Sequence, residues 1–199
     1  MDYAEALKES PSLVAELRKR LMPEKGEKPE ISAPAQTPAA PLSIHAMADC
    51  DSVYSLLYRH CENVAHLIGG TMPNVPVVKE VSGEPVGLSA GTEPDEAYDH
   101  ALKLARYLEH QTHLAPRMWQ TKIAREVIRT VARLTERYPT HEPEELLNAR
   151  CRGCERLTLY RYPPKRYRAE EFYKCKSCGL THTEPEMTAQ RMKRQEEIK

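Results

Sequence analysis

Four cysteines near the C-terminus fall into two pairs, Cys151/Cys154 and Cys175/Cys178, with two residues inside each pair and twenty between the pairs. Two intervening residues let both thiolates of one turn reach the same tetrahedral ion, at a Zn–S distance of about 2.3 Å. Two such pairs supply four ligands, which is the sequence form of a zinc ribbon. The spacing therefore predicts one structural Zn²⁺.

The four cysteines are also compatible with chemistry other than structural zinc. Disulfides are uncommon in a reducing cytoplasm. Iron remains an open alternative, because it shares the four-thiolate ligand set with zinc. A catalytic zinc is disfavoured, since four thiolates leave no position for water or substrate. His182 could replace one ligand, but the set is complete without it.

The segment between the cysteine pairs has the pattern of a short β-hairpin. Residues 157–162 alternate Leu, Thr and Tyr, and Phe172-Tyr173 precedes the second pair, with Pro163-Pro164 in between. Gly153 and Gly179 would allow the backbone to bend around sulfur. We expect a zinc ribbon over residues 149–185, with two antiparallel strands stabilised by the metal.

Positive charge is concentrated in this segment, although the whole chain is neutral, with 29 Lys and Arg against 29 Asp and Glu. Residues 148–182 hold nine Lys and Arg and three Glu, interleaved with aromatic residues. Bases can neutralise phosphates while aromatic rings stack on nucleobases. The predicted nucleic-acid contacts are Arg156, Arg161, Lys165, Arg166, Arg168, Tyr160, Tyr162 and Tyr167. Alternatively, the tyrosines form the small core and the bases only keep it soluble.

The elements before the ribbon are predicted to be helical. Residues 43–68, 92–113 and 116–138 carry apolar residues at three- and four-residue steps, which indicates a small helical bundle over 43–138 with a long loop at 71–91. Thr92 is the expected start of the second helix. In the third helix the expected buried stripe begins at Trp119. Cys50 and Cys61 share one helix face, and we interpret them as core residues.

A second basic feature lies on the third helix, away from its apolar stripe. It comprises Lys122, Arg125, Arg129, Arg133 and Arg137. Five bases in line could follow a phosphate backbone. The more ordinary interpretation is a solvated face that forms ion pairs with nearby glutamates.

The N-terminal segment is expected to be a tethered helix. Ser10 before Pro11 resembles a helix start, and Leu13, Leu17 and Leu21 follow at helical spacing within residues 1–22. Residues 23–42 form a Pro/Ala-rich linker. This predicts a helix free to bind a protein partner. Residues 186–199 are expected to form a charged helix or tail.

The apolar runs are too short for a membrane span, and residues 1–10 lack an apolar signal region. We therefore expect a cytoplasmic protein without a membrane partner.

The order of these parts resembles small zinc-ribbon proteins of actinobacteria and their phages. The resemblance rests on the four cysteines, Gly179, Leu159-Tyr160 and the Trp119 helix pattern, and covers about residues 45–182. Longer members look like helix-turn-helix DNA-binding regulators. No recognition helix of that kind follows the ribbon here, which puts sequence-specific DNA binding in doubt.

Together these patterns predict a mainly α protein: a helical bundle followed by a four-cysteine zinc ribbon. The expected function is that of a non-enzymatic nucleic-acid-binding accessory or regulatory protein. The alternative is a protein–protein adaptor in which the ribbon is only a scaffold. An enzyme is the third choice, because we find no phosphate-binding glycine loop and no nucleophile or paired-carboxylate signature.

Overall fold

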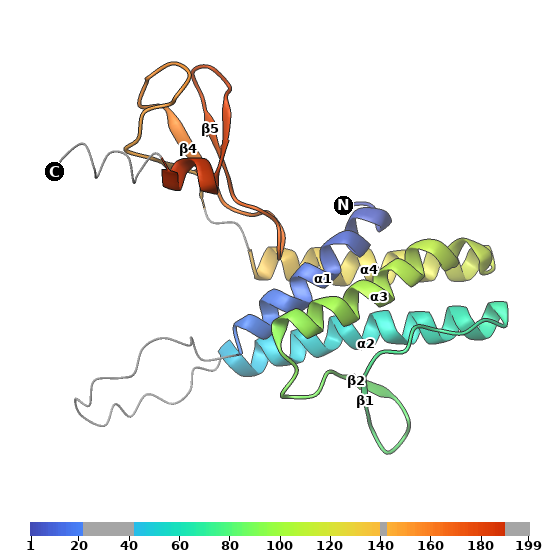
Figure 1. Cartoon of the computed structure of the whole chain (residues 1–199). Helices are drawn as coiled ribbons and strands as arrows, with labels where there is room; N and C mark the ends of the chain where they lie inside the picture. Colours follow the sequence, from blue (N-terminus) through green and yellow to red (C-terminus); the bar gives the residue numbers. More distant parts are fainter. Residues whose placement is uncertain (22–41, 140–142, 190–199) are drawn as a thin grey trace, which may run out of the picture. The chain divides into compact units, whose positions relative to one another are not determined.

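A computed structural model describes residues 1–21, 42–139 and 143–189. The chain divides into two compact units, Met1–Pro139 and Thr140–Lys199, and each is considered by itself. The first unit is mainly helical and the second contains a small antiparallel sheet (Figure 1). The four clustered cysteines belong to the second unit. The predicted fold class, a mainly α chain ending in a four-cysteine hairpin domain, is confirmed.

The first unit packs its long helices side by side around one apolar core (Figure 1). The elements are α1 (Tyr3–Lys19), α2 (Leu42–Ile68), α3 (Pro94–Gln111), the 3-10 turn η1 (Thr112–Leu114) and α4 (Arg117–Arg137). The predicted apolar stripes supply this core, including Cys50 and Cys61, which are both fully buried. Burial raises the pKa of Cys50 to about 12, as expected for core thiols rather than reactive ones.

The prediction of a tethered N-terminal helix is wrong, because α1 is part of the core. Leu7, Leu13, Val14 and Leu17 are buried against the other helices, with α3 making the most extensive contact. A helix whose apolar face is buried in its own unit cannot offer that face to a protein partner. Of the predicted linker at 23–42, residues 23–41 lie outside the described residues, and Leu42 is the first residue of α2.

The predicted helix start at Ser10 and Pro11 is wrong, because Pro11 lies inside α1. Asp2 is the N-cap, and its carboxylate accepts a hydrogen bond from the Glu5 amide at 2.8 Å. Proline has no N–H, so Pro11 cannot donate to the carbonyl of Leu7. The Ser10 hydroxyl donates to that carbonyl instead, at 2.9 Å. The Ser-Pro pair thus compensates for a mid-helix proline rather than starting a helix.

The other helices follow the sequence patterns with two corrections. α3 begins at Pro94 with Glu93 as N-cap, while the Thr92 hydroxyl bonds that of Ser89 at 2.9 Å. Trp119 is only half-buried, and the Lys122 ammonium lies 4.9 Å from its ring centroid. The buried stripe of α4 starts one turn later, at Ile123.

The long loop before α3 contains a small two-stranded ribbon, β1 (Val78–Lys79) and β2 (Pro85–Gly87). Its end is attached to α2 through Asp51, whose Oδ1 accepts a hydrogen bond from the Leu88 amide at 3.2 Å. A Cβ on Gly87 would lie 2.2 Å from the same oxygen, so only glycine fits this approach.

The second unit has a four-stranded antiparallel sheet in the order β3-β4-β5-β6. The strands are β3 (Glu145–Leu146), β4 (Leu159–Tyr162), β5 (Phe172–Cys175) and β6 (Thr181–Thr183). The predicted hairpin is confirmed as β4 and β5, with Tyr162 opposite Phe172. β3 pairs with β4, so the sheet begins before residue 149, the predicted start of the ribbon.

The predicted C-terminal charged segment is also partly built into this unit. Residues 184–189 are helical, and Met187 is 1% exposed in the small core beneath the sheet. Residues 190–199 lie outside the described part of the chain. No helix among the described residues is sufficiently long and apolar for a membrane span.

Candidate metal centre and its surface

The four cysteines come from two turns that flank the central hairpin. Cys151 and Cys154 lie in the turn before β4, whereas Cys175 ends β5 and Cys178 lies in the turn before β6. In each turn the amide that follows the second cysteine donates to the carbonyl of the first: Glu155 to Cys151 at 2.8 Å and Gly179 to Cys175 at 2.9 Å.

The two turns reach the same left-handed bend with different residues. Gly179 has φ +76°, as expected for glycine, but in the first turn Glu155 takes this conformation with φ 56°. Gly153, which we expected to provide the bend, has no positive φ. Its lack of a side chain serves packing instead, because a Cβ there would lie 3.0 Å from Leu180 Cδ2.

The sulfur positions fit a tetrahedral metal ion. All four Sγ atoms lie within 4.8 Å of one another, with 3.5 Å between Cys151 and Cys178 and 3.6 Å between Cys154 and Cys175. A tetrahedral ion with bonds of about 2.3 Å would hold its sulfurs about 3.8 Å apart. The predicted ligand set is therefore brought together and could hold one ion.

His182 lies beside this set rather than in it. It is buried on β6, and its Nε2 lies 3.7 Å from Cys151 Sγ. An imidazole N–H at that position can donate to a thiolate and orient it, as groups around metal ligands commonly do. The group of ligand atoms that lie within 4.8 Å of one another comprises the four sulfurs and does not include His182.

Hydrogen bonds around the sulfurs favour thiolates at one position and oppose them at another. A hydrogen bond with Thr158 and backbone hydrogen bonds at Cys178 and Ser177 lower the pKa of Cys175 to about 6. At Cys178 the Leu180 amide lowers the pKa, but burial and the neighbouring cysteines outweigh it and raise the value to about 12. Four adjacent thiolates repel one another, so full ionisation of the set needs a cation.

The sheet separates two kinds of side chain onto its two faces. Leu159, Tyr173, Cys175 and His182 point into the small core. The opposite register positions form what we call the outer face, which comprises Leu146, Tyr160, Tyr162, Phe172, Lys174, Thr181 and Thr183.

Arg161, a predicted nucleic-acid contact, lies on the core side. Its Nε is 2.7 Å from a Glu171 carboxylate oxygen, and its Nη1 is 3.6 Å from Glu145. Glu171 also bonds the Tyr173 hydroxyl, which reaches Glu184 as well. Arg161 is therefore a structural ion-pair partner within the sheet.

The other predicted contacts lie in the β4–β5 loop, beside the second cysteine turn and on the outer face. Lys165, Arg166 and Arg168 are exposed in the loop between β4 and β5, where Arg168 lies 5.9 Å from the half-buried Tyr167 ring. Arg156 bonds the Ser177 hydroxyl at 2.9 Å, beside the second turn.

Tyr160 and Tyr162 lie on the outer face with different neighbours. The Lys176 ammonium covers Tyr160, at 3.9 Å from the ring centroid, and also lies 3.0 Å from a Glu144 oxygen. Tyr162 is stacked on Phe172, with centroids 4.9 Å apart and ring planes 3° from parallel. The predicted contacts did not include Phe172 and Lys174, which the β4–β5 register places on this face opposite Tyr162 and Tyr160.

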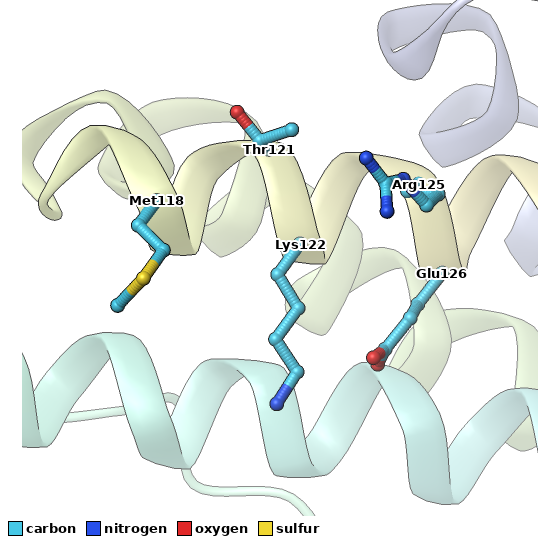
Figure 2. Close-up of a pocket in the computed structure, with 5 residues that line it drawn as sticks. All are labelled: Met118, Thr121, Lys122, Arg125 and Glu126. Carbon is cyan, nitrogen blue, oxygen red and sulfur yellow. The ribbon is translucent and has the colours of Figure 1, made fainter.

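The basic arc on α4 is partly engaged in local contacts. Arg137 pairs with Asp49 at 2.9 Å, and Lys122 lies over Trp119. Met118, Lys122 and Glu126 extend toward α2 and, with Thr121 and Arg125, line an open groove of about 400 Å³ (Figure 2). Glu126 lies 3.1 Å from His60 Nε2 and is the one carboxylate of the groove lining, against the two basic side chains of Lys122 and Arg125.

Comparison with protein-family models, curated proteins and solved structures found no match. Function must therefore be argued from the fold and from the site.

Proposed function

We propose that this chain is a non-enzymatic nucleic-acid-binding accessory or regulatory protein whose four cysteines hold one structural Zn²⁺. The observation that supports zinc is the four-sulfur cluster with spacings near those of a tetrahedral site. A metal held by four thiolates has no free ligand position, so its role is to stabilise the sheet. A reducing compartment such as the cytoplasm keeps these thiols available.

Nucleic-acid binding is supported by the distribution of charge in the second unit. The loop bases Lys165, Arg166 and Arg168 are exposed, and Lys174 lies on the outer face, where the nearby carboxylate of Glu144 is paired with Lys176 at 3.0 Å. Glu145 and Glu171 are paired with Arg161 on the core side. A polyanion could therefore approach the loop and the outer face without meeting those carboxylates.

The adaptor hypothesis is weakened, because the N-terminal helix that was expected to bind a partner is part of the core. It depended on an unpartnered N-terminal helix, and the apolar residues of α1 are buried in the helical unit. The proposed resemblance to actinobacterial and phage zinc-ribbon proteins remains a prediction.

The metal is tested by elemental analysis of the purified full chain. One zinc per chain is expected, because the four thiolates form a single site. Iron in place of zinc would contradict the assignment of the metal. Metal content that survives modification of all accessible thiols would contradict the assignment of the ligands.

Nucleic-acid binding is tested by salt titration with single-stranded and duplex DNA. Reversal of the loop charges by Lys165→Glu, Arg166→Glu and Arg168→Glu should weaken binding and flatten the salt dependence, by about 0.7 to 0.9 in the logarithmic slope for each lost phosphate contact. Arg161 is left unchanged, since its loss would disturb the sheet.

A matched control carries the same change of net charge on the helical unit, through Lys8→Glu, Lys19→Glu and Lys103→Glu at exposed positions. If the control weakens binding equally, total charge rather than the ribbon explains the effect. If the wild-type protein binds neither form of DNA at low salt, nucleic-acid binding is refuted.

A further inference from the structure

The outer face carries an aromatic pair, Tyr162 and Phe172, that lies outside the hydrophobic core of its unit. Phe172 is 39% exposed, and it stacks in parallel on the half-buried Tyr162 on the side of the sheet opposite Cys175 and Met187. Leu146 adds a further exposed apolar side chain, at 55%. Aromatic residues placed on the solvent side of a small sheet indicate an interaction surface.

We propose that the Tyr162–Phe172 pair is a stacking platform for the bases of single-stranded nucleic acid. This inference rests on the proposed function and assigns it a face and a form of nucleic acid. Two parallel rings that are stacked on each other can extend their stack with a further flat ring, and loss of such a stacked base weakens binding about fivefold to a hundredfold.

The charges on this face favour a nucleic acid over a protein segment. Lys174 lies two residues from Phe172 on β5, at a register position opposite Tyr160. Two further charged side chains reach this face beside Tyr160, Lys176 and Glu144, and they pair with each other at 3.0 Å, so Lys174 supplies its net positive charge. The loop bases Lys165, Arg166 and Arg168 lie between the two platform strands in the sequence. Aromatic rings with flanking bases match the alternation of bases and phosphates along a strand.

Single strands are favoured over duplex because stacking requires open bases. In a duplex each base is covered by its neighbours and its pairing partner, so a flat aromatic pair on a sheet has no base face to contact. Tyr160 is a weaker platform than Tyr162, since Lys176 covers its ring at 3.9 Å. This predicts that Phe172 and Tyr162 matter more than Tyr160.

The test compares three probes on the full-length, zinc-loaded chain: oligothymidylate of about 12 nucleotides, an abasic oligomer with the same number of phosphates, and a duplex of equal length. We expect the oligothymidylate to bind most tightly. Phe172→Ala should weaken that binding about fivefold to a hundredfold, with little effect on the abasic oligomer. Phe172→Trp should restore it.

Two further variants separate stacking from charge and from general damage. Lys174→Gln should reduce the logarithmic salt slope by about 0.7, through loss of one phosphate contact, without removing the preference for bases. Leu157→Ala changes an exposed apolar residue outside the platform and should leave binding unchanged. Zinc content is measured for each variant, so that an unfolded ribbon is recognised.

The outcomes distinguish this inference from the proposed function. If the oligothymidylate and the abasic oligomer bind equally and Phe172→Ala has no effect, stacking is wrong while phosphate binding stands. Equal or tighter binding of duplex also overturns the platform. If sedimentation shows a dimer that Phe172→Ala separates, the face is an interface between two copies. If no probe binds, both proposals fail together.

Discussion

Arg18 on α1 and Asp51 on α2 form an ion pair. Substitution of Asp51 and substitution of Arg18 should destabilise the helical unit to different extents. Arg18 is 2% exposed, and its Nη2 lies 3.6 Å from Asp51 Oδ1. Asp51 is less buried and also accepts from the Leu88 amide. Burial raises the pKa of Asp51, although the Leu88 amide and Arg18 act against this.

Asp51→Asn should therefore destabilise the helical unit more than Arg18→Met. The first change leaves a buried guanidinium without its counter-charge, which costs about 3 kcal/mol, while the second leaves a carboxylate that water can reach and costs about 1 kcal/mol. Urea unfolding followed by helical circular dichroism measures both. A larger loss for Arg18→Met would show that the pair acts mainly through its packing.

His60 should make the stability of the helical unit depend on pH. Burial lowers its pKa from 6.5 to about 4. The positive charges of Arg59 and Lys122 also lower this pKa, whereas Glu126 raises it. As the pH falls, the unfolded chain therefore takes up the proton before the folded chain does. The contribution of neutral His60 to the free energy of unfolding is complete above pH 6.5 and is lost as the pH falls toward 4. The total loss is about 3 kcal/mol.

His60→Leu should flatten the dependence of unfolding free energy on pH over this range, because leucine cannot be protonated. Urea denaturation at several pH values provides the measurement. His45→Gln, at an exposed position, is the control. An unchanged profile in the His60 variant would assign the acid sensitivity to another group.

At the scale of elements, α1 should behave as a core helix. Leu17 is fully buried, so Leu17→Ala should cost about 2 to 5 kcal/mol in unfolding free energy. Lys8→Ala, on the exposed side of the same helix, should cost little. Hydrogen exchange should find the α1 amides protected in the wild-type monomer. Rapid exchange there would restore the interpretation of α1 as a tethered helix.

At the scale of the whole molecule, the two units should lose structure separately. Cys175→Ser removes one of four metal ligands, and the ribbon core of Leu159, Tyr173 and Met187 is too small to fold well without the ion. We expect loss of zinc and proteolytic cleavage within residues 143–189. The helical circular dichroism should remain, because the helical unit has its own core.

Cys61→Ala is the matched control for this change, as it removes a thiol outside the cluster and should retain zinc. Global loss of helical signal in the Cys175 variant would mean that the two units depend on each other for folding.

Sequence alone was sufficient where the determining interactions are local. The spacing within each cysteine pair identified the four clustered sulfurs, strand alternation identified the β4–β5 hairpin, and helical periodicity identified α3 and α4. In each case the pattern repeats within one turn, one strand or one helix, so neighbouring residues carry the information.

Only the tertiary structure decided which of these elements meet. It placed α1 in the core despite the intervening segment, because an apolar face is buried wherever a complementary face exists, whatever the distance along the chain. It also turned Arg161 toward Glu171 and left Phe172 exposed on the opposite face. Both positions follow from strand register. Register is set by contacts between different segments of the chain, and the sequence of a single segment does not specify those contacts.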